Sequence, residues 1–167
     1  MAWAVMTPAP PPSTYLVFSQ DSADAPHVDR LAAHAARFFD AKIELVARAT
    51  PTYPETPARV RVRLTCTRPP FARELSLTVR VATRGDLADA RDAEARGRAA
   101  GMGALAERCP RVWEIADDGG GEGSAEQALL TMSAICASVA LGPVLPPDHG
   151  TLFGVRGAIE RRERAPG

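Results

Sequence analysis

The sequence predicts an α+β domain built on a mostly antiparallel sheet of about five strands, with helices packed on one face. Three observations predict this class. Residues 59–66 and 74–81 alternate between apolar and polar side chains, which indicates two half-buried strands in a hairpin. Segments with helical apolar spacing separate the other predicted strands. A chain of 167 residues, 46% hydrophobic and 24% charged, is also long enough to bury its own core without disulfides or metals.

The first strand and the first helix are predicted near the N-terminus. Residues 15–18 form a short apolar run that indicates a buried strand, and the polar segment 19–24 ends it. Asp24 is the expected N-cap of the following helix, Pro26 lies in its first turn, and the helix should end near Asp40. Apolar side chains at helical spacing give this helix one buried stripe: Val28, Leu31, Ala32, Ala35 and Phe39.

Three strands should follow, the last two as the hairpin. Residues 42–48 alternate between apolar and charged side chains, and the prolines of TPTYPETP cannot continue a ladder. Residues 59–66 and 74–81 alternate more clearly, and TRPPFAR is expected to connect them as a loop. The apolar faces of the two hairpin strands are Val60, Val62, Leu64 and Cys66, then Leu75, Leu77, Val79 and Val81.

A weak helix and a fifth strand are predicted next. Residues 86–108 carry a weak helical stripe, but each glycine costs roughly 1 kcal/mol in a helix interior. The glycines therefore predict a break or very close packing between Gly97 and Gly103. Residues 111–116 indicate the fifth strand, and the segment DDGGGEG after it is expected to be a flexible surface loop.

A long apolar helix is predicted in the C-terminal part of the chain. Ser124 and Gln127 have the spacing of a capping box, and the pair Gly142–Pro143 should end the helix. No charged residue lies in positions 128–145, a length that approaches that of a membrane span. Three hydroxyl residues, many alanines and the Gly-Pro stop favour instead a helix buried against the sheet. The predicted order is thus β-α-β-β-β-α-β-α.

The chain is expected to form one domain between two tails. Residues 1–13 form a Pro-rich N-terminal arm, residues 14–160 the single α+β domain, and residues 161–167 a charged C-terminal tail. A last short helix is expected to begin at Val155. The N-terminus has neither the positive region nor the sustained apolar stretch of a secretory signal, so we expect the chain to stay in the cytoplasm.

Composition and charge narrow the functional classes. Basic and acidic residues both number 20, and a formal net charge of +0 lacks the field that draws a basic protein to nucleic acid or anionic lipid. Nearly all basic residues are arginine, and with the abundant alanine this indicates a GC-rich bacterial genome. Cys66, Cys109 and Cys136 are widely spaced and offer neither a CxxC motif nor a disulfide framework. No metal and no cofactor are therefore expected.

The glycine-rich segment DDGGGEG precedes a predicted helix, and phosphates often bind at the N-terminus of a helix. It lacks the lysine of a P-loop, and Asp117, Asp118 and Glu122 would repel a phosphate. A flexible surface loop is the favoured interpretation of this segment.

The outer face of the hairpin is the feature that most requires a partner. It carries four residues that we call the arginine face: Arg59, Arg61, Arg63 and Arg80. Because side chains alternate, an antiparallel register that keeps the apolar sets together should place Arg80 opposite one of the other three. Like charges directly opposite each other destabilise a ladder, so negative charge from elsewhere should neutralise this face.

Two sources could supply that negative charge. One is intramolecular, from acidic residues at the start of the following helix: Asp86, Asp89, Asp92 and Glu94. The other is an anionic partner. Lys42 and Arg48 are expected on the same face, where only Glu44 and Glu74 would offset the positive charge. Aromatic residues for base stacking are missing from these strands, so an acidic protein surface fits better than a nucleic acid.

These observations favour a non-enzymatic protein-interaction or adaptor domain that uses the arginine face. The alternative is a small enzyme or ligand-binding domain whose site gathers His34, Asp148 and His149, because a carboxylate beside an imidazole can orient a general base. A pocket that joins those three side chains would favour the alternative. No membrane partner is expected, and a homo-oligomer is compatible with the sequence.

Overall fold

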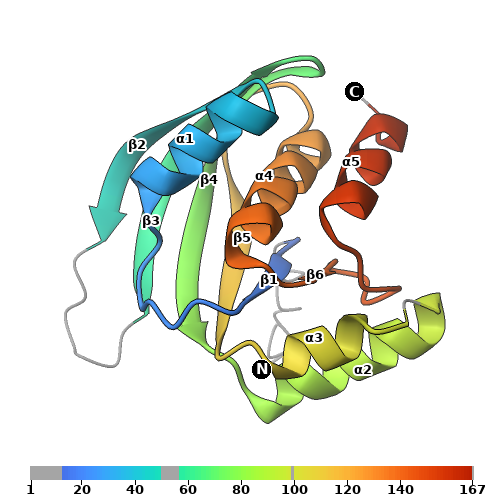
Figure 1. Ribbon diagram of the computed structural model, residues 1–167. Coiled ribbons are helices and arrows are strands. Elements are labelled where there is room, and N and C mark those ends of the chain that lie inside the picture. The colour runs from blue at the N-terminus through green and yellow to red at the C-terminus, as the bar shows by residue number, and fades with distance from the viewer. Residues whose placement is uncertain (1–12, 50–56, 99, 167) are drawn as a thin grey trace, which may run out of the picture.

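The computed structural model describes residues 13–49, 57–98 and 100–166, and it has the predicted α+β fold (Figure 1). All strands pair antiparallel in one six-stranded sheet, in the order β2-β3-β4-β5-β1-β6. The strands are β1 (Tyr15–Ser19), β2 (Ala41–Ala49), β3 (Ala58–Thr67), β4 (Pro70–Val81), β5 (Arg111–Glu122) and β6 (Val144–Leu145). The helices are α1 (Val28–Phe38), α2 (Arg84–Gly97), α3 (Met102–Glu107), α4 (Ala125–Ala140) and α5 (Val155–Arg164). Of the predicted Pro-rich arm, only Ser13 belongs to the described residues.

The larger hydrophobic core lies between one face of the sheet and the helices α1 and α4. The predicted apolar faces of β3 and β4 are buried in it, except for Val81, which is 61% exposed at the end of β4. Helix α4 is buried along nearly its whole length. Its Thr131 and Ser133 hydroxyls donate to main-chain carbonyls one turn earlier, at 2.8 and 2.7 Å, which satisfies these polar groups inside an apolar core. Among the described residues, no helix combines the length and apolarity needed to cross a membrane.

A second, smaller core forms on the opposite face of the sheet. Alternate residues of a strand point to opposite faces, so Val17 of β1 joins the larger core while Phe18 joins the smaller one. Helices α2 and α3 pack there against Phe18, Val112 and Leu145, at the end of the sheet formed by β5, β1 and β6. Helices therefore lie on both faces of the sheet, not on one as predicted. The outer face of β3, with its arginines, stays exposed.

The register of the β3–β4 hairpin differs from the predicted one. Only Arg68 and Pro69 lie between the two strands, so the connection is shorter than the loop predicted from the sequence. This tight turn pairs Arg63 with Glu74, and Arg80 lies beyond the paired part of β3. The prediction that Arg80 faces another residue of the arginine face is therefore wrong.

Strand β5 continues through the acidic glycine segment that the sequence predicted to be a loop. It extends to Glu122, but its pairing with β4 is irregular. Leu75 pairs with Asp117 whereas Arg73 pairs with Gly121, so a four-residue step on β5 faces a two-residue step on β4. Gly121 has φ +110°, which glycine adopts without a Cβ clash. The glycines thus form a bulge within a strand rather than a free loop.

Helix α1 starts later than predicted. His27, not Asp24, is its N-cap residue, and no side chain caps this end. Asp24 instead pairs with Arg111 of β5, with an N–O distance of 2.8 Å.

The predicted interruption of the alanine-rich helix is confirmed. Helix α2 ends at Gly97 and α3 begins at Met102. A Cβ at Gly97 would lie 1.8 Å from the Thr151 Oγ1, so close packing accompanies the break. The last helix begins at Val155, as predicted, and continues to Arg164, so the predicted start of the charged tail falls inside α5.

Candidate functional site

The arginine face is largely neutralised by carboxylates of the same chain. Arg63 pairs with Glu74, its direct neighbour on β4, with an N–O distance of 3.1 Å. Arg61 pairs with Asp118 on β5 at 2.9 Å. Strand β5 could supply this acid only because the segment predicted as a loop pairs with β4.

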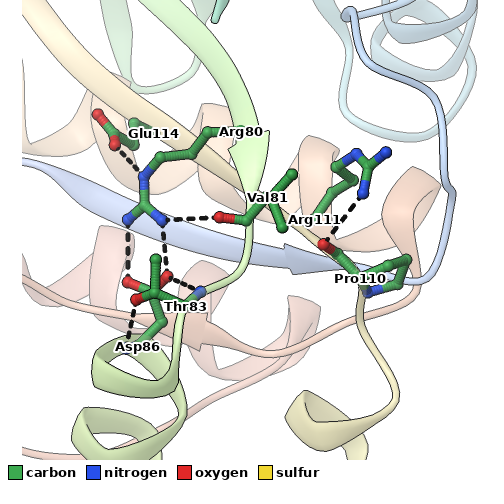
Figure 2. Close-up of polar contacts among 7 residues, drawn as sticks. All are labelled: Arg80, Val81, Thr83, Asp86, Pro110, Arg111 and Glu114. Atoms are coloured by element: carbon green, nitrogen blue, oxygen red, sulfur yellow. Dashed lines mark hydrogen bonds and ion pairs between the residues drawn. The ribbon is translucent and has the colours of Figure 1, made fainter. Parts of the chain in front are cut away.

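Arg80 lies at the centre of a partly buried polar cluster (Figure 2). Its guanidinium donates to both oxygens of Asp86, at 2.6 and 2.9 Å, and its Nε donates to Glu114. The Asp86 side chain, only 9% exposed, also accepts the main-chain N–H of Thr83 at 2.7 Å. The Thr83 hydroxyl accepts the Asp86 N–H in return, which makes a complete capping box at the start of α2.

These contacts shift the protonation of Asp86. Burial by itself raises the pKa of this carboxyl, but the hydrogen bonds from Arg80 and from the Thr83 N–H outweigh burial and hold the pKa below its usual value. The charged carboxylate therefore ties the end of β4 to α2. Among the acids predicted to neutralise the arginine face from α2, Asp86 is the one whose described contacts reach it.

Arg59 and Arg61 differ from the other two arginines because they share a single carboxylate. Asp118 lies 2.9 Å from Arg61 and 3.7 Å from Arg59, and its own side chain is only 16% exposed. The two arginine side chains are 50% and 57% exposed. They border a shallow hollow of about 250 Å³, lined by Ala47, Arg48, Ala49, Arg59 and Arg61.

The two other basic residues predicted for this face have different positions. Lys42 pairs with Glu44 at 3.4 Å on the exposed edge strand. The pairing of β2 with β3 is irregular between Leu45 and Ala47, and beyond this point Arg48 pairs with Val60, a buried residue of the opposite face. The prediction that Arg48 shares the outer face is therefore wrong, because one extra residue reverses the alternation.

Sequence reasoning missed Arg73, which lies on the other face of the sheet from the arginine face, because it pairs with the buried residue Leu64. Arg73 donates to both oxygens of Asp117, at 3.0 and 2.8 Å, and also to the Gly123 carbonyl. The pair is bidentate and only 14% and 20% exposed, and it fixes the bulged end of β5 on β4. Arg73 has the same parity as the buried residues Leu75 and Leu77, so the alternation predicts an apolar side chain there and carries no signal for this ion pair.

The three residues of the alternative site have separate contacts. His34 of α1 lies 2.5 Å from the Ser138 hydroxyl of α4, and burial together with two neighbouring arginines lowers its pKa. Asp148 accepts the Gly150 N–H at 2.9 Å, as in an ordinary turn, and the His149 carbonyl accepts from Arg96. Within the described ranges, no hydrogen bond or ring contact joins His34 to the other two residues.

The cysteines are buried and free. Burial raises the pKa of Cys109 to about 11 and moves that of Cys136 upward as well. The part of the chain that the structure describes contains no group of three His, Cys, Asp or Glu side chains placed to hold a metal ion.

Comparison with known proteins gave no relative: no family model matches this chain, and neither the curated proteins nor the solved structures include a significant match.

Proposed function

We propose that this chain is a non-enzymatic interaction domain that binds an acidic segment of another protein through Arg59 and Arg61. One observation carries the proposal: two half-exposed guanidinium groups share one carboxylate beside a hollow. Two positive charges against one negative charge leave an excess of one, which a carboxylate of a partner would neutralise.

The other two members of the arginine face contribute less to this binding. Arg63 has its own acid in Glu74, and Arg80 has two in Asp86 and Glu114. A partner would have to displace these acids, whereas Arg59 and Arg61 retain unused N–H donors in their five-donor guanidinium groups. The proposed contact is therefore restricted to the end of β3 that lies beside Ala47–Ala49.

The chemistry of the hollow favours a protein over a nucleic acid. Single-stranded nucleic acids bind through aromatic side chains that stack on bases, together with basic residues along the backbone. Among the residues that the structure describes, the lining of the hollow consists of arginine and alanine. An Asp or Glu side chain can form a bidentate pair with arginine without any stacking surface.

A pull-down from a lysate of the organism of origin tests this proposal. The double variant Arg59→Gln, Arg61→Gln should lose a defined partner that the wild-type protein captures, and a peptide of consecutive glutamates should compete with that partner. Arg63→Gln is the matched control, because Arg63 lies on the same strand and is similarly exposed, at 51%, but is paired with Glu74. Far-UV circular dichroism checks that each variant is folded.

Two results would contradict the proposal. One is equal capture by the wild type and the double variant, which would remove the role of these arginines. The other is equal loss in the Arg63→Gln control, which would mean that general surface charge, and not the shared carboxylate, determines binding.

A further inference from the structure

A cavity lies beside α4 and α5. These two helices pack side by side (Figure 1). The cavity has a volume of about 700 Å³, within the range of about 300–1,000 Å³ typical of small-molecule sites. Its walls come from the start of β1, the first turns of α4, residues 151–153 and one side of α5. The lining residues come from several elements that are distant in the sequence, so the cavity forms only when the chain folds.

The inner part of the cavity is apolar, and α5 packs closely against it. Leu130, Leu152 and Phe153 line it, and the last two are only 2% and 6% exposed. Gly157 allows α5 to approach this floor, because a Cβ there would lie 2.6 Å from the Phe153 Cβ. The floor therefore has a fixed shape suited to an apolar group.

A hydrogen-bonded pair borders the cavity on the side of β1 and α4. The Tyr15 side chain is 3% exposed, and its hydroxyl donates to Glu126. Burial and the adjacent Glu126 carboxylate raise the pKa of Tyr15, so its hydroxyl keeps its proton. The pair offers acceptor positions on Glu126 for a hydroxyl or ammonium group of a ligand.

Positive charge comes from α5. Arg161 and Arg164 both line the cavity, one turn apart on the same side of the helix. The lining also contains two carboxylates, but each has a partner: Glu126 accepts from the Tyr15 hydroxyl, and Glu160 pairs with Arg156. The Arg161 guanidinium lies 4.6 Å from the centre of the Phe153 ring, which holds it above the apolar floor. Within the described parts of the chain, neither arginine has a carboxylate at ion-pair distance, whereas Arg156 on the same helix pairs with Glu160 at 3.3 Å.

We propose that this cavity binds a small organic anion, with its acid group on Arg161 and Arg164 and an apolar portion on Leu130, Leu152 and Phe153. An acidic group can accept hydrogen bonds from both guanidinium groups, and a flat apolar portion matches the floor. A carboxylate and a phosphate share this chemistry. The proposal is independent of the arginine face, which lies on the opposite side of the sheet from α4.

Protein-observed NMR with phenylacetate and phenyl phosphate tests the proposal on the full chain. Both anions should shift the amide signals of residues 151–153 and 157–165, and the stronger of the two identifies the preferred acid group. Benzyl alcohol, which keeps the ring but has no charge, should bind roughly tenfold more weakly or less well still, because it loses the charge-assisted hydrogen bonds.

Variants connect the binding to the two arginines. The double variant Arg161→Gln, Arg164→Gln should weaken the binding of the preferred anion by roughly tenfold or more. Arg91→Gln is the matched control, because it also removes a positive charge, but Arg91 is 65% exposed and its partner Glu107 is outside the cavity lining. The amide spectrum of each variant shows directly whether it is folded.

Three results would overturn the proposal. The first is the absence of shifts with either anion at millimolar concentration, and the second is binding of benzyl alcohol as strong as that of the anions. The third is an equal loss of affinity in Arg91→Gln, which would reduce the effect to the net charge of the chain.

Discussion

Replacing Asp86 by asparagine should lower the free energy of unfolding by about 2 kcal/mol at neutral pH. The carboxylate accepts two hydrogen bonds from Arg80, at 2.6 and 2.9 Å, and a third from the Thr83 N–H. Asparagine can keep one acceptor, but its NH₂ group then faces the guanidinium, and a hydrogen bond to a charged group typically contributes about 1.5–3 kcal/mol. Glu114 still pairs with Arg80 in the variant, which keeps the loss moderate.

The pH dependence of this loss identifies its cause. The pKa of Asp86 is lower in the folded chain than in the unfolded chain, so its contribution to stability is complete above the unfolded value of about 4. The contribution disappears as the pH falls through the lower, folded pKa. The difference in stability between the wild type and Asp86→Asn should therefore be full at pH 7 and should shrink steadily below about pH 4.

Urea unfolding, followed by circular dichroism at several pH values, measures this difference. For a chain of this length, a change of about 2 kcal/mol also corresponds to a melting temperature lower by about 4–8 °C. Glu107→Gln is the matched control, because it removes an exposed pair with Arg91 and should cost less than about 0.5 kcal/mol. The reasoning fails if Asp86→Asn costs no more than this control, or if its cost is the same at pH 3 and pH 7.

Three further predictions concern packing and burial. Gly142→Ala should destabilise the fold by about 1–3 kcal/mol in thermal melts, because the new Cβ would lie 1.8 Å from a main-chain carbonyl oxygen of β1. Gly85→Ala is the control and should leave the stability unchanged, because its new Cβ would have its nearest contact at 3.6 Å. Leu77→Ala should lower the free energy of unfolding, measured in urea, by about 2–5 kcal/mol, because Leu77 is fully buried. Val81→Ala, on the same strand but 61% exposed, should lower it by less than about 0.5 kcal/mol. Similar losses in the two variants would contradict the assignment of the core face. Cys109, whose pKa burial raises to about 11, should react with a thiol reagent at pH 8 much more slowly in the folded chain than in urea, and equal rates would show that it is not buried.

Much of the secondary structure could be predicted because it depends on neighbours in the sequence. Period-two alternation identified β3, and its predicted apolar residues are buried. Ser124 caps α4 through the Gln127 N–H, which is one half of the predicted capping box; the Gln127 side chain donates to the Ala165 carbonyl instead. The free-energy cost of glycine in a helix interior likewise predicted the break that ends α2 at Gly97.

Two predictions were wrong because glycine and aspartate each occur in more than one kind of local structure. The glycines after Asp118 predicted a loop, yet they form a bulge that keeps β5 in the sheet. Asp24 has a good N-cap side chain, but it pairs with Arg111 and leaves the start of α1 to His27. In both cases a contact with a distant segment replaced the local preference.

The sequence by itself determined the fold class, the apolar faces of the central strands and the buried character of α4, because these follow from the periodicity of side chains along one segment. Only the tertiary structure decided which charges meet. A tight turn displaced Arg80 from the other arginines and a bulge turned Arg48 to the opposite face, while β5 placed Asp118 between Arg59 and Arg61. Register and bulges shift whole sets of side chains by one or two positions, and the packing of distant segments, not local pattern, fixes those shifts.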